Sequence, residues 1–295
     1  MSAQQGTRLA ELFEAHRGHL RAVAYRMLGS LAEADDAVQE AWVRFSAAGA
    51  GDVMNVGGWL TTIVTRVSLN VLRARAARPE QLAGVHVPDP IVTRADAAAP
   101  DPEQEALLAD SVGLALLVVL DSLVPAERVA FVLHDVFDVP FGEIGEILGR
   151  SSEAARQLAS RARRRVRDGG APAPAGTLAE QHEVVNAFFA AARAGDFDRL
   201  VELLDPEAVM RADGGARTSA SMVLRGAEAI ARTAAGSAGP GAEFVPVVVN
   251  GAAGMLITVR GRPAALFGFT VAGGRIVAGD GIIDPGRLAK LSLPR

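Results

Sequence analysis

The stretch from Phe131 to Arg167 constrains the fold most, because two helical patterns flank one glycine there. Apolar residues recur on one face of a helix over Phe141–Leu148. Gly149 can end that helix with a positive φ, and Ser151 and Ser152 can each cap a second helix. Two helices joined by such a tight turn are typical of a helix-turn-helix, whose second helix enters the major groove of DNA.

The second helix has an apolar side and a polar side. The apolar side consists of Ala155, Leu158, Ala159, Ala162 and Val166. The opposite side carries Arg156, Gln157, Ser160, Arg161 and Arg164. Arginine can bind guanine, and glutamine can bind adenine, through two hydrogen bonds. The pattern therefore predicts DNA binding, with a solvated face on an ordinary helical bundle as the alternative.

The net charge of −4 is unusual for a DNA-binding protein, but the charge is unevenly distributed. Between Arg150 and Arg167 the only acidic residue is Glu153, and the basic residues are Arg150, Arg156, Arg161, Arg163, Arg164, Arg165 and Arg167. Affinity for DNA depends on such a local basic patch, because each phosphate contact releases counterions locally.

The 295 residues favour two or three domains, and 49% hydrophobic residues suffice for sizeable cores. The absence of cysteine excludes disulfides and thiolate metal sites. Met1–Glu14 is polar, which argues against a signal peptide, and the longest apolar run is too short to span a bilayer. We expect a cytoplasmic protein, with no metal and no cofactor.

Three amphipathic helices are predicted before the first linker, over Thr7–Leu28, Glu33–Ser46 and Trp59–Arg78. The first should bury Leu9, Leu12, Phe13, Leu20, Val23 and Ala24. The second should bury Ala37, Val38, Ala41, Trp42 and Phe45, and should expose Asp35, Asp36, Gln39, Glu40 and Arg44. The third should bury Leu60, Ile63, Val64, Val67, Val71 and Leu72. Its outer side or edge would carry Trp59, Thr62, Arg66, Asn70 and Arg73.

These polar faces each have an ordinary explanation. The acidic face of the second helix could simply be solvated. Trp59 could pack in a helical core, or it could stack on unpaired bases beside neighbouring polar groups.

The segment Pro79–Pro102 is a linker rich in Pro, Ala and Asp. It contains a stiff apolar island, Val85–Pro90, of the kind that docks onto another surface. Helices over Glu103–Val124 and Ala126–Phe137 should complete a small all-α unit with the helix-turn-helix. A second linker spans Gly169–Gly176.

The C-terminal part changes character. Helices over Leu178–Arg193 and Phe197–Leu204 precede β-type runs separated by Gly-rich turns. The runs are Ala208–Ala212, Ala242–Asn250, Met255–Val259, Pro263–Val271 and Arg275–Ile283. Helices followed by a curved antiparallel sheet imply an α+β fold.

The ordered set of motifs resembles the bacterial extracytoplasmic-function (ECF) sigma factors. The matching text is Tyr25–Gly29, Ala34–Trp42, Trp59–Ile63, Val139–Phe141 and Leu148–Ser151. Arg8–Arg78 is similar to the sigma-2 domain, and Glu103–Arg167 is similar to sigma-4. Thr177–Lys290 resembles a SnoaL-like domain, a cone-shaped NTF2-like fold, as in SigJ-type fusions.

The resemblance implies roles for the polar faces. Contacts to the β′ clamp of core RNA polymerase would come from Asp35, Asp36, Gln39 and Glu40. The −10 promoter element would be melted and bound by Trp59, Thr62, Arg66, Asn70 and Arg73. The −35 element would be bound by Ser152, Arg156, Gln157, Ser160, Arg161 and Arg164. The partners implied are core polymerase, through its β′ clamp and β flap, and promoter DNA.

Three further motifs match the fusion type: Val87-Pro88-Asp89-Pro90, Asp213-Gly214-Gly215, and Asp284-Pro285-Gly286-Arg287-Leu288. The family usually has Trp where this chain has His86. We predict that Val87, Pro88, Asp89 and Pro90 dock against Asp213, Gly214, Gly215, Asp284, Pro285, Arg287 and Leu288, and that this contact regulates the sigma domains in cis.

The predicted domains are 1–78 (sigma-2-like), 103–170 (sigma-4-like) and 177–295 (SnoaL-like), with linkers 79–102 and 171–176. The alternative is a helix-turn-helix regulator whose third domain senses a ligand or acts as an enzyme. Acid–base chemistry would need a paired carboxylate and His, or a Tyr, in the cone. Asp213 and Asp280 could meet there, while His182 is expected to be exposed and Tyr25 lies in another domain. We therefore expect no catalytic residue; a small-molecule ligand is conceivable.

Overall fold

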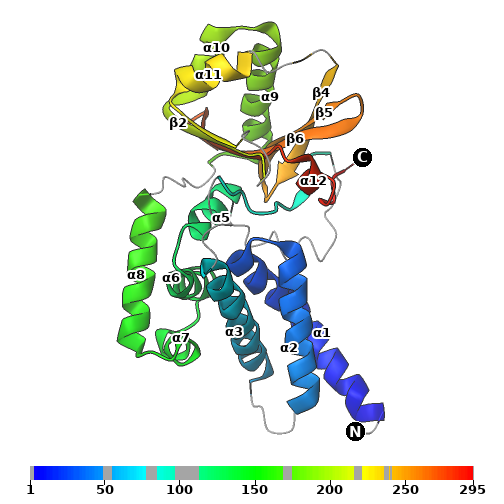
Figure 1. Cartoon of the computed structure of the whole chain (residues 1–295), viewed down its shortest axis with the longest axis vertical. Coiled ribbons are helices and arrows are strands. Elements are labelled where there is room, and N and C mark those ends of the chain that lie inside the picture. The colour runs from blue at the N-terminus through cyan, green and yellow to red at the C-terminus, as the bar shows by residue number, and fades with distance from the viewer. Residues whose placement is uncertain are drawn as a thin grey trace. The chain divides into compact units, whose positions relative to one another are not determined.

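The computed structural model describes residues 3–48, 55–77, 85–96, 113–168, 175–215, 221–235, 239 and 241–294. The chain forms two compact units, each of which contains separate stretches of sequence (Figure 1). The helical unit comprises Met1–Glu80, Asp101–Asp110 and Leu120–Gly169, and the sheet unit comprises Gln81–Pro100, Ser111–Val119 and Gly170–Arg295. Within the described ranges, no helix combines the length and the apolar character needed to cross a membrane.

Three helices at the start of the helical unit confirm the sequence prediction: α1 (Ala3–Leu28), α2 (Leu31–Ala48) and α3 (Val56–Ala76). Helix α3 begins three residues before the predicted start at Trp59, because the Asn55 side chain accepts the Gly58 N–H at 2.9 Å and caps it. The predicted inner side of α2 is confirmed, with four of its five residues buried and Trp42 half-buried.

The buried side of α3 differs in part from the prediction. Ile63, Val67 and Val71 are only half-buried. Leu60, Val64 and Leu72 are buried as predicted, and they are joined by Thr61, Thr65, Ser68 and Leu69. Short hydroxyl side chains can occupy such positions when they bond to their own helix, as Thr61 does by donating to the Gly57 carbonyl at 2.9 Å.

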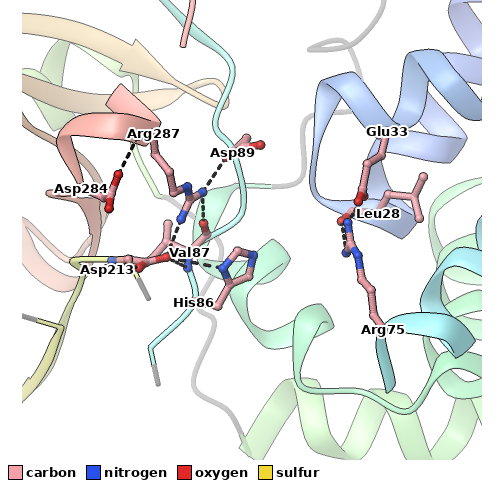
Figure 2. Close-up of polar contacts among 10 residues, drawn as sticks. Leu28, Glu33, Arg75, His86, Val87, Asp89, Asp213, Asp284 and Arg287 are labelled. Carbon is pink, nitrogen blue, oxygen red and sulfur yellow. Dashed lines mark hydrogen bonds and ion pairs between the residues drawn. The ribbon is translucent and has the colours of Figure 1, made fainter. Parts of the chain in front are cut away.

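Arg75 joins the ends of the first three helices (Figure 2). Its guanidinium donates to the Leu28 carbonyl at 2.9 Å, at the C-terminus of α1. It also forms an ion pair with Glu33 in the first turn of α2. The contact satisfies a carbonyl that the end of α1 would otherwise leave without an intrahelical partner.

The rest of the helical unit is formed by α6 (Pro125–Phe131), the π-helical turn η2 (Val132–Val136), α7 (Phe141–Leu148) and α8 (Ser152–Asp168). The predicted helix over Glu103–Val124 is wrong at its end, and its first part lies outside the described residues. Helix α5 (Leu114–Asp121) stops earlier, because Val124 is extended before Pro125, which begins α6.

The sheet unit contains seven strands in the order β1-β4-β5-β6-β7-β2-β3. The strands are β1 (Val92–Arg94), β2 (Leu204–Asp213), β3 (Met222–Arg225), β4 (Ala242–Val249), β5 (Ala252–Val259), β6 (Arg262–Ala272) and β7 (Arg275–Ile282). The pairing is antiparallel except between β2 and β7. The five predicted strands are confirmed, whereas β1 and β3 are additional.

Both faces of this sheet are covered. Helices α9 (Leu178–Ala194), α10 (Phe197–Leu203) and α11 (Ala227–Ala235) pack over one face around Phe188, Leu200, Ile230 and Phe269. The opposite face packs against Val87 of the linker, Leu114 of α5 and Leu288 of the short helix α12 (Pro285–Leu288), and Val92 of strand β1 joins the same core. The linker is thus part of the core of the sheet unit.

Candidate functional site

The outer face of α2 carries the predicted acidic surface. Asp35, Asp36, Gln39 and Glu40 are all exposed. Arg21 holds Asp35 through two hydrogen bonds of 2.6 and 3.1 Å, and Arg44 forms an ion pair with Glu40 at 2.9 Å. Within the described part of the chain, Asp36 and Gln39 make no side-chain hydrogen bond. This face is therefore available to a basic partner.

The predicted outer residues of α3 are placed along one side of the helix, but they differ in burial. Arg66, Asn70 and Arg73 are exposed, while Trp59 and Thr62 are half-buried. The Trp59 ring lies 5.6 Å from the Phe45 ring, and the Thr62 hydroxyl donates to the Gly58 carbonyl at 3.0 Å. Trp59 thus packs against Phe45 while remaining half-buried, and its stacking on unpaired bases stays a prediction.

Helices α7 and α8 form the predicted helix-turn-helix. Gly149 has φ of 67°, and Arg150 donates its N–H to the Gly145 carbonyl at 2.8 Å. A Cβ on Gly145 would lie 2.8 Å from the Arg150 carbonyl oxygen, so a larger residue would force the turn apart. Ser151 caps α8 by accepting the Ala154 N–H at 3.2 Å, as predicted.

The polar side of α8 is exposed as predicted. It comprises Ser152, Arg156, Gln157, Ser160, Arg161 and Arg164. The opposite side buries Ala155, Leu158, Ala159 and Ala162, whereas Val166 is only half-buried. An exposed row of hydrogen-bond donors on a packed helix is the geometry that a major-groove contact requires.

Carboxylates missed by the sequence analysis hold several of the α8 arginines. The Glu127 side chain, 5% exposed, accepts from Arg161 at 2.8 Å and pairs with Arg165 at 3.0 Å. Asp135 of η2 accepts from Arg163 at 2.5 Å. Glu153 was therefore not the only acid near this basic surface. A linear sequence window could not find the others, because α6 and η2 approach α8 only through tertiary packing.

The linker motif beginning at Val87 and the two motifs beginning at Asp213 and Asp284 meet in the sheet unit (Figure 2). We name this cluster the linker clamp; it consists of His86, Val87, Asp89, Asp213, Asp284 and Arg287. The Asp213 carboxylate accepts the Val87 N–H at 3.0 Å, the Gly215 N–H at 2.8 Å and Arg287 at 2.5 Å. Arg287 also donates to the Val87 carbonyl and to Asp89, both at 2.6 Å. The Asp213 carboxylate thus binds the backbone N–H of Val87, and Arg287 binds the backbone carbonyl of the same residue.

Each remaining member of the motifs has a structural place. Val87, Pro88, Pro90, Gly214 and Leu288 are buried, and Pro285 is exposed. The Asp284 carboxylate accepts the Arg287 N–H at 2.7 Å and so caps α12. A Cβ on Gly215, whose φ is 76°, would overlap the Asp284 carboxylate. The glycine is therefore needed for both its conformation and its small size.

The electrostatics of the clamp favour an ionised Asp213. Burial alone would raise the pKa of this carboxyl. Hydrogen bonds from His86, from the Val87 N–H and from the Gly215 N–H, together with the charge of Arg287, outweigh burial and lower the pKa of Asp213 to about 2. The exposed His86 ring lies 3.5 Å from the carboxylate and occupies the position where the family usually has Trp.

A second anchor of the linker was not predicted. The Asn250 side chain accepts the Ile91 N–H at 2.9 Å, and the Asn250 N–H donates to the Ile91 carbonyl at the same distance. Asn250 and Gly251 both have positive φ and form the two-residue turn between β4 and β5. The Asn-Gly pair is a strong hairpin signal that the sequence analysis could have used.

The prediction that Asp213 and Asp280 could meet in the cone is wrong. The cavity of the cone is lined by Met210 and Ala212 of β2, whereas Asp213 belongs to the clamp. Asp280 pairs with Arg211 at 3.0 Å outside the cavity lining, and burial raises the pKa of this carboxyl. His182 is half-buried rather than exposed and lies 3.2 Å from the Val247 carbonyl. No group of three or more His, Asp or Glu in the described ranges is arranged to hold a metal ion.

Comparisons with known proteins agree with this arrangement. Residues 12–78 match the family model for Sigma-70 region 2, and residues 113–166 match Sigma-70, region 4. The chain is 44% identical to the ECF RNA polymerase sigma factor SigJ of Mycobacterium tuberculosis (strain ATCC 25618 / H37Rv) over 226 residues, which is 75% of this chain and 70% of that protein.

A second relative is described as a probable ECF RNA polymerase sigma factor, SigI, from the same strain. It is 34% identical over 284 residues, covering 95% of this chain and 94% of SigI. The crystal structure of M. tuberculosis SigJ matches with a TM-score of 0.76 and 36% identity, covering 97% of this chain and all of that chain. The predicted fold class, helical sigma domains followed by an α+β domain, is thereby confirmed.

Proposed function

Because the chain belongs to the ECF RNA polymerase sigma factor family, we propose that three of its surfaces divide the work of transcription initiation. The α2 face with Asp35, Asp36, Gln39 and Glu40 binds the β′ clamp of core polymerase. The α3 side with Trp59, Thr62, Arg66, Asn70 and Arg73 opens and holds the −10 element. The α8 side with Ser152, Arg156, Gln157, Ser160, Arg161 and Arg164 binds the −35 element, beside a contact of this domain with the β flap.

The observation that carries the proposal is the contrast between the two sides of α8. One side is buried and apolar, and the other presents a continuous row of donors suited to base edges and phosphates. We assign the roles to the domains 1–78 and 103–170, joined by 79–102, with 177–295 as the regulatory domain after the linker 171–176. The place of action is the cytoplasm, where core polymerase is found.

The polymerase contact is tested by charge reversal. Asp36→Arg with Glu40→Arg should abolish co-elution with core polymerase, because the surface would then repel a basic partner. Exposed substitutions of this kind change folding stability by about 0.5 kcal/mol or less. Glu183→Arg with Glu202→Arg, two exposed acids of the sheet unit, is the matched control and should leave co-elution intact. Unchanged co-elution of the first variant would overturn the assignment.

We further propose that the sheet unit modulates promoter use in cis through the linker clamp. The two sigma domains must separate to span the −35 and −10 elements, so a clamp that holds the segment joining them controls their reach. Buried Val87 and the five polar contacts to Asp213 and Arg287 support this role. The clamp needs only a few kcal/mol of differential contact to bias one arrangement over another.

Truncation tests the regulatory proposal. Ending the chain before Asp284 removes Arg287 and α12 but leaves all seven strands in place. Amides of the linker around Val87 and Ile91 should then exchange with solvent faster, and run-off transcription with core polymerase should change. Equal amide exchange in the full-length and shortened proteins would contradict the clamp.

Within the part of the chain that the structure describes, the cone carries no set of groups suited to acid–base catalysis. The described lining consists of apolar residues and one threonine, Thr233, so we propose a regulatory rather than an enzymatic domain. In this proposal the third domain is not an enzyme, which distinguishes it from the alternative of a helix-turn-helix regulator with an enzymatic third domain.

A further inference from the structure

A cavity of about 350 Å³ lies between the helices and the sheet of the sheet unit. Its walls are aromatic, with Phe188, Phe189, Phe244, Phe267 and Phe269. Its other surfaces are formed largely by short or aliphatic side chains. Phe244 and Phe267 are only half-buried, although they belong to a packed core.

The lining defines the chemistry of a ligand. Among the described residues, none of the lining side chains is ionisable, and a charged ligand would lose its hydration without gaining an ion-pair partner from them. An apolar cavity of about 150 Å³ in another protein stays dry and binds benzene. The cavity of this chain has more than twice that volume, which suits an uncharged molecule of two or three rings or an aliphatic chain of similar bulk.

The same strands form both the cavity and the linker clamp. Successive side chains of a strand point to opposite faces, so Ala212 lines the cavity while Asp213 binds the linker. A second pair of neighbouring residues is divided in the same way directly after β7, where Ile283 lines the cavity and Asp284 caps α12. The Ile283 N–H donates to the Asp213 carbonyl at 2.8 Å, which ties the two segments together.

We propose that this cavity binds an uncharged, mainly apolar small molecule, and that binding tightens the linker clamp. A ligand in contact with Ala212 and Ile283 packs against the backbone that presents Asp213 and Asp284, and therefore restrains those carboxylates in the clamping arrangement. The proposal rests on the regulatory role proposed for the clamp. It adds that an uncharged, mainly apolar small molecule is the signal that controls the clamp.

The first experiment measures binding of a neutral fluorescent probe, N-phenyl-1-naphthylamine, to the full-length protein. Ile257→Trp should fill part of the cavity and weaken binding at least about tenfold, whereas Val245→Trp, an exposed position of β4 that does not line the cavity, should leave it unchanged. If Ile257→Trp folds poorly, Thr233→Asp places a charge at an exposed lining position and should weaken binding as well.

The charge of the probe gives an independent measurement. The sulfonated analogue, 1-anilinonaphthalene-8-sulfonate, should bind at least about tenfold more weakly than the neutral probe, because its charge lacks a partner in the cavity. No binding of the neutral probe, equal affinity for the two probes, or equal affinity of all variants would overturn the assignment of the cavity.

The second experiment tests coupling by amide exchange of Val87 and Ile91, whose N–H groups donate to Asp213 and Asn250. Saturating neutral probe should slow their exchange roughly fivefold or more. Coupling is reciprocal, so Arg287→Ala should weaken probe binding by the same factor. If these amides are protected without the probe and the bound probe does not change their exchange rate, the coupling is overturned and the clamp stands. Unprotected amides without probe would instead overturn the proposed clamp.

Discussion

Arginine–carboxylate contacts occur in both units, but they differ in exposure and in the number of partners. On α8, the Arg156 side chain is 61% exposed and pairs with Glu153, which is 63% exposed. In the linker clamp, the Arg287 side chain is 21% exposed and donates to two carboxylates and one carbonyl. The Asp213 side chain beneath it is only 4% exposed.

This difference separates two uses of the same chemistry. An exposed pair has a small net free energy, so a DNA phosphate or a base can replace the glutamate at little cost. A buried, multiply bonded arginine leaves an uncompensated charge when one partner is removed. The Arg156–Glu153 contact of α8 is thus suited to exchange for an external partner, whereas the contacts of the clamp, like those of the buried Glu127 carboxylate, are suited to holding one conformation.

Removal of the clamp arginine should have the largest effect. Arg287→Ala leaves the buried Asp213 carboxylate without its guanidinium and the Val87 carbonyl without its donor. Breaking one side of a buried pair costs about 3–5 kcal/mol, and we expect the linker amides of Val87 and Ile91 to lose most of their protection from exchange. Amide exchange followed by mass spectrometry measures this loss.

The matched control is Arg199→Ala, which removes an exposed pair with Glu202 on α10. It should leave the linker amides protected, because an exposed pair within one helix contributes about 0.5 kcal/mol or less. If Arg287→Ala and Arg199→Ala behaved alike, the distinction between buried and exposed arginines would fail for this protein.

Base recognition by α8 should have an intermediate effect. Gln157→Ala should weaken binding to the preferred −35 duplex by about 1–3 kcal/mol and relax preference at one base pair, if its amide contacts an adenine. Arg164→Ala should weaken binding to all sequences by a similar amount and lower the salt dependence by about one counterion. Competition binding with single-base variants of the duplex distinguishes the two. Equal loss on every duplex for Gln157→Ala would contradict base recognition.

Much of this surface could be predicted from sequence because it depends on local patterns. The bounds of α7, the turn at Gly149 and the exposed side of α8 all follow from spacing within one segment. Glu127 and Asp135 could not be predicted, since their pairing with α8 depends on how α6 and η2 pack against it. The clamp motifs were found only through the family resemblance, because residues 126 and 200 positions apart share no local signal.

The pH dependence of the clamp sharpens the comparison further. The pKa of Asp213 is lowered from 3.8 to about 2 in the folded clamp, which stabilises the fold by ~2 kcal/mol at neutral pH. Linker docking contributes the part of this that comes from His86 and the Val87 N–H. Because this pKa is lowered, the stabilisation is present above about pH 4 and is lost as the pH falls toward 2. Linker protection should therefore be constant between pH 5 and 7 as far as Asp213 is concerned.

Low-pH amide exchange, corrected for the intrinsic rate, measures this loss. Asp213→Asn is the control, because it cannot titrate and should abolish the acid-dependent component of docking. Asp280 acts in the opposite direction, since burial raises its pKa and its ionised form is disfavoured. Loss of docking between pH 5 and 7 in the Asp213→Asn variant as well as in the unmodified protein would assign the dependence to a group other than Asp213.

Parts of the fold were missed for equally physical reasons. Strand β1 has only three residues, and its pairing with β4 is supported by the contact between Ile91 and Asn250. Such a strand lacks a periodic pattern of its own. Helix α11 and strand β3 are also short, and their alanines, arginines and aliphatic residues fit several structures equally well. Strands β4 to β7 were predicted because their β-type runs are separated by Gly-rich turns.

The smallest expected effect concerns the exposed pair of Glu153 and Arg156 on α8. Their separation of 3.3 Å and exposures of 63% and 61% predict a net contribution of about 0.5 kcal/mol or less to folding. Glu153→Gln should therefore leave the thermal midpoint almost unchanged. It should strengthen binding to −35 duplexes by no more than about threefold, because Arg156 is released and a negative charge near the phosphates is removed.

Glu127→Gln provides the contrast, since its buried carboxylate supports two arginines and its loss should lower stability more than it alters DNA affinity. Thermal unfolding and duplex titration of the two variants in parallel measure both quantities. A large drop in stability for Glu153→Gln would show that exposure does not make an α8 contact exchangeable.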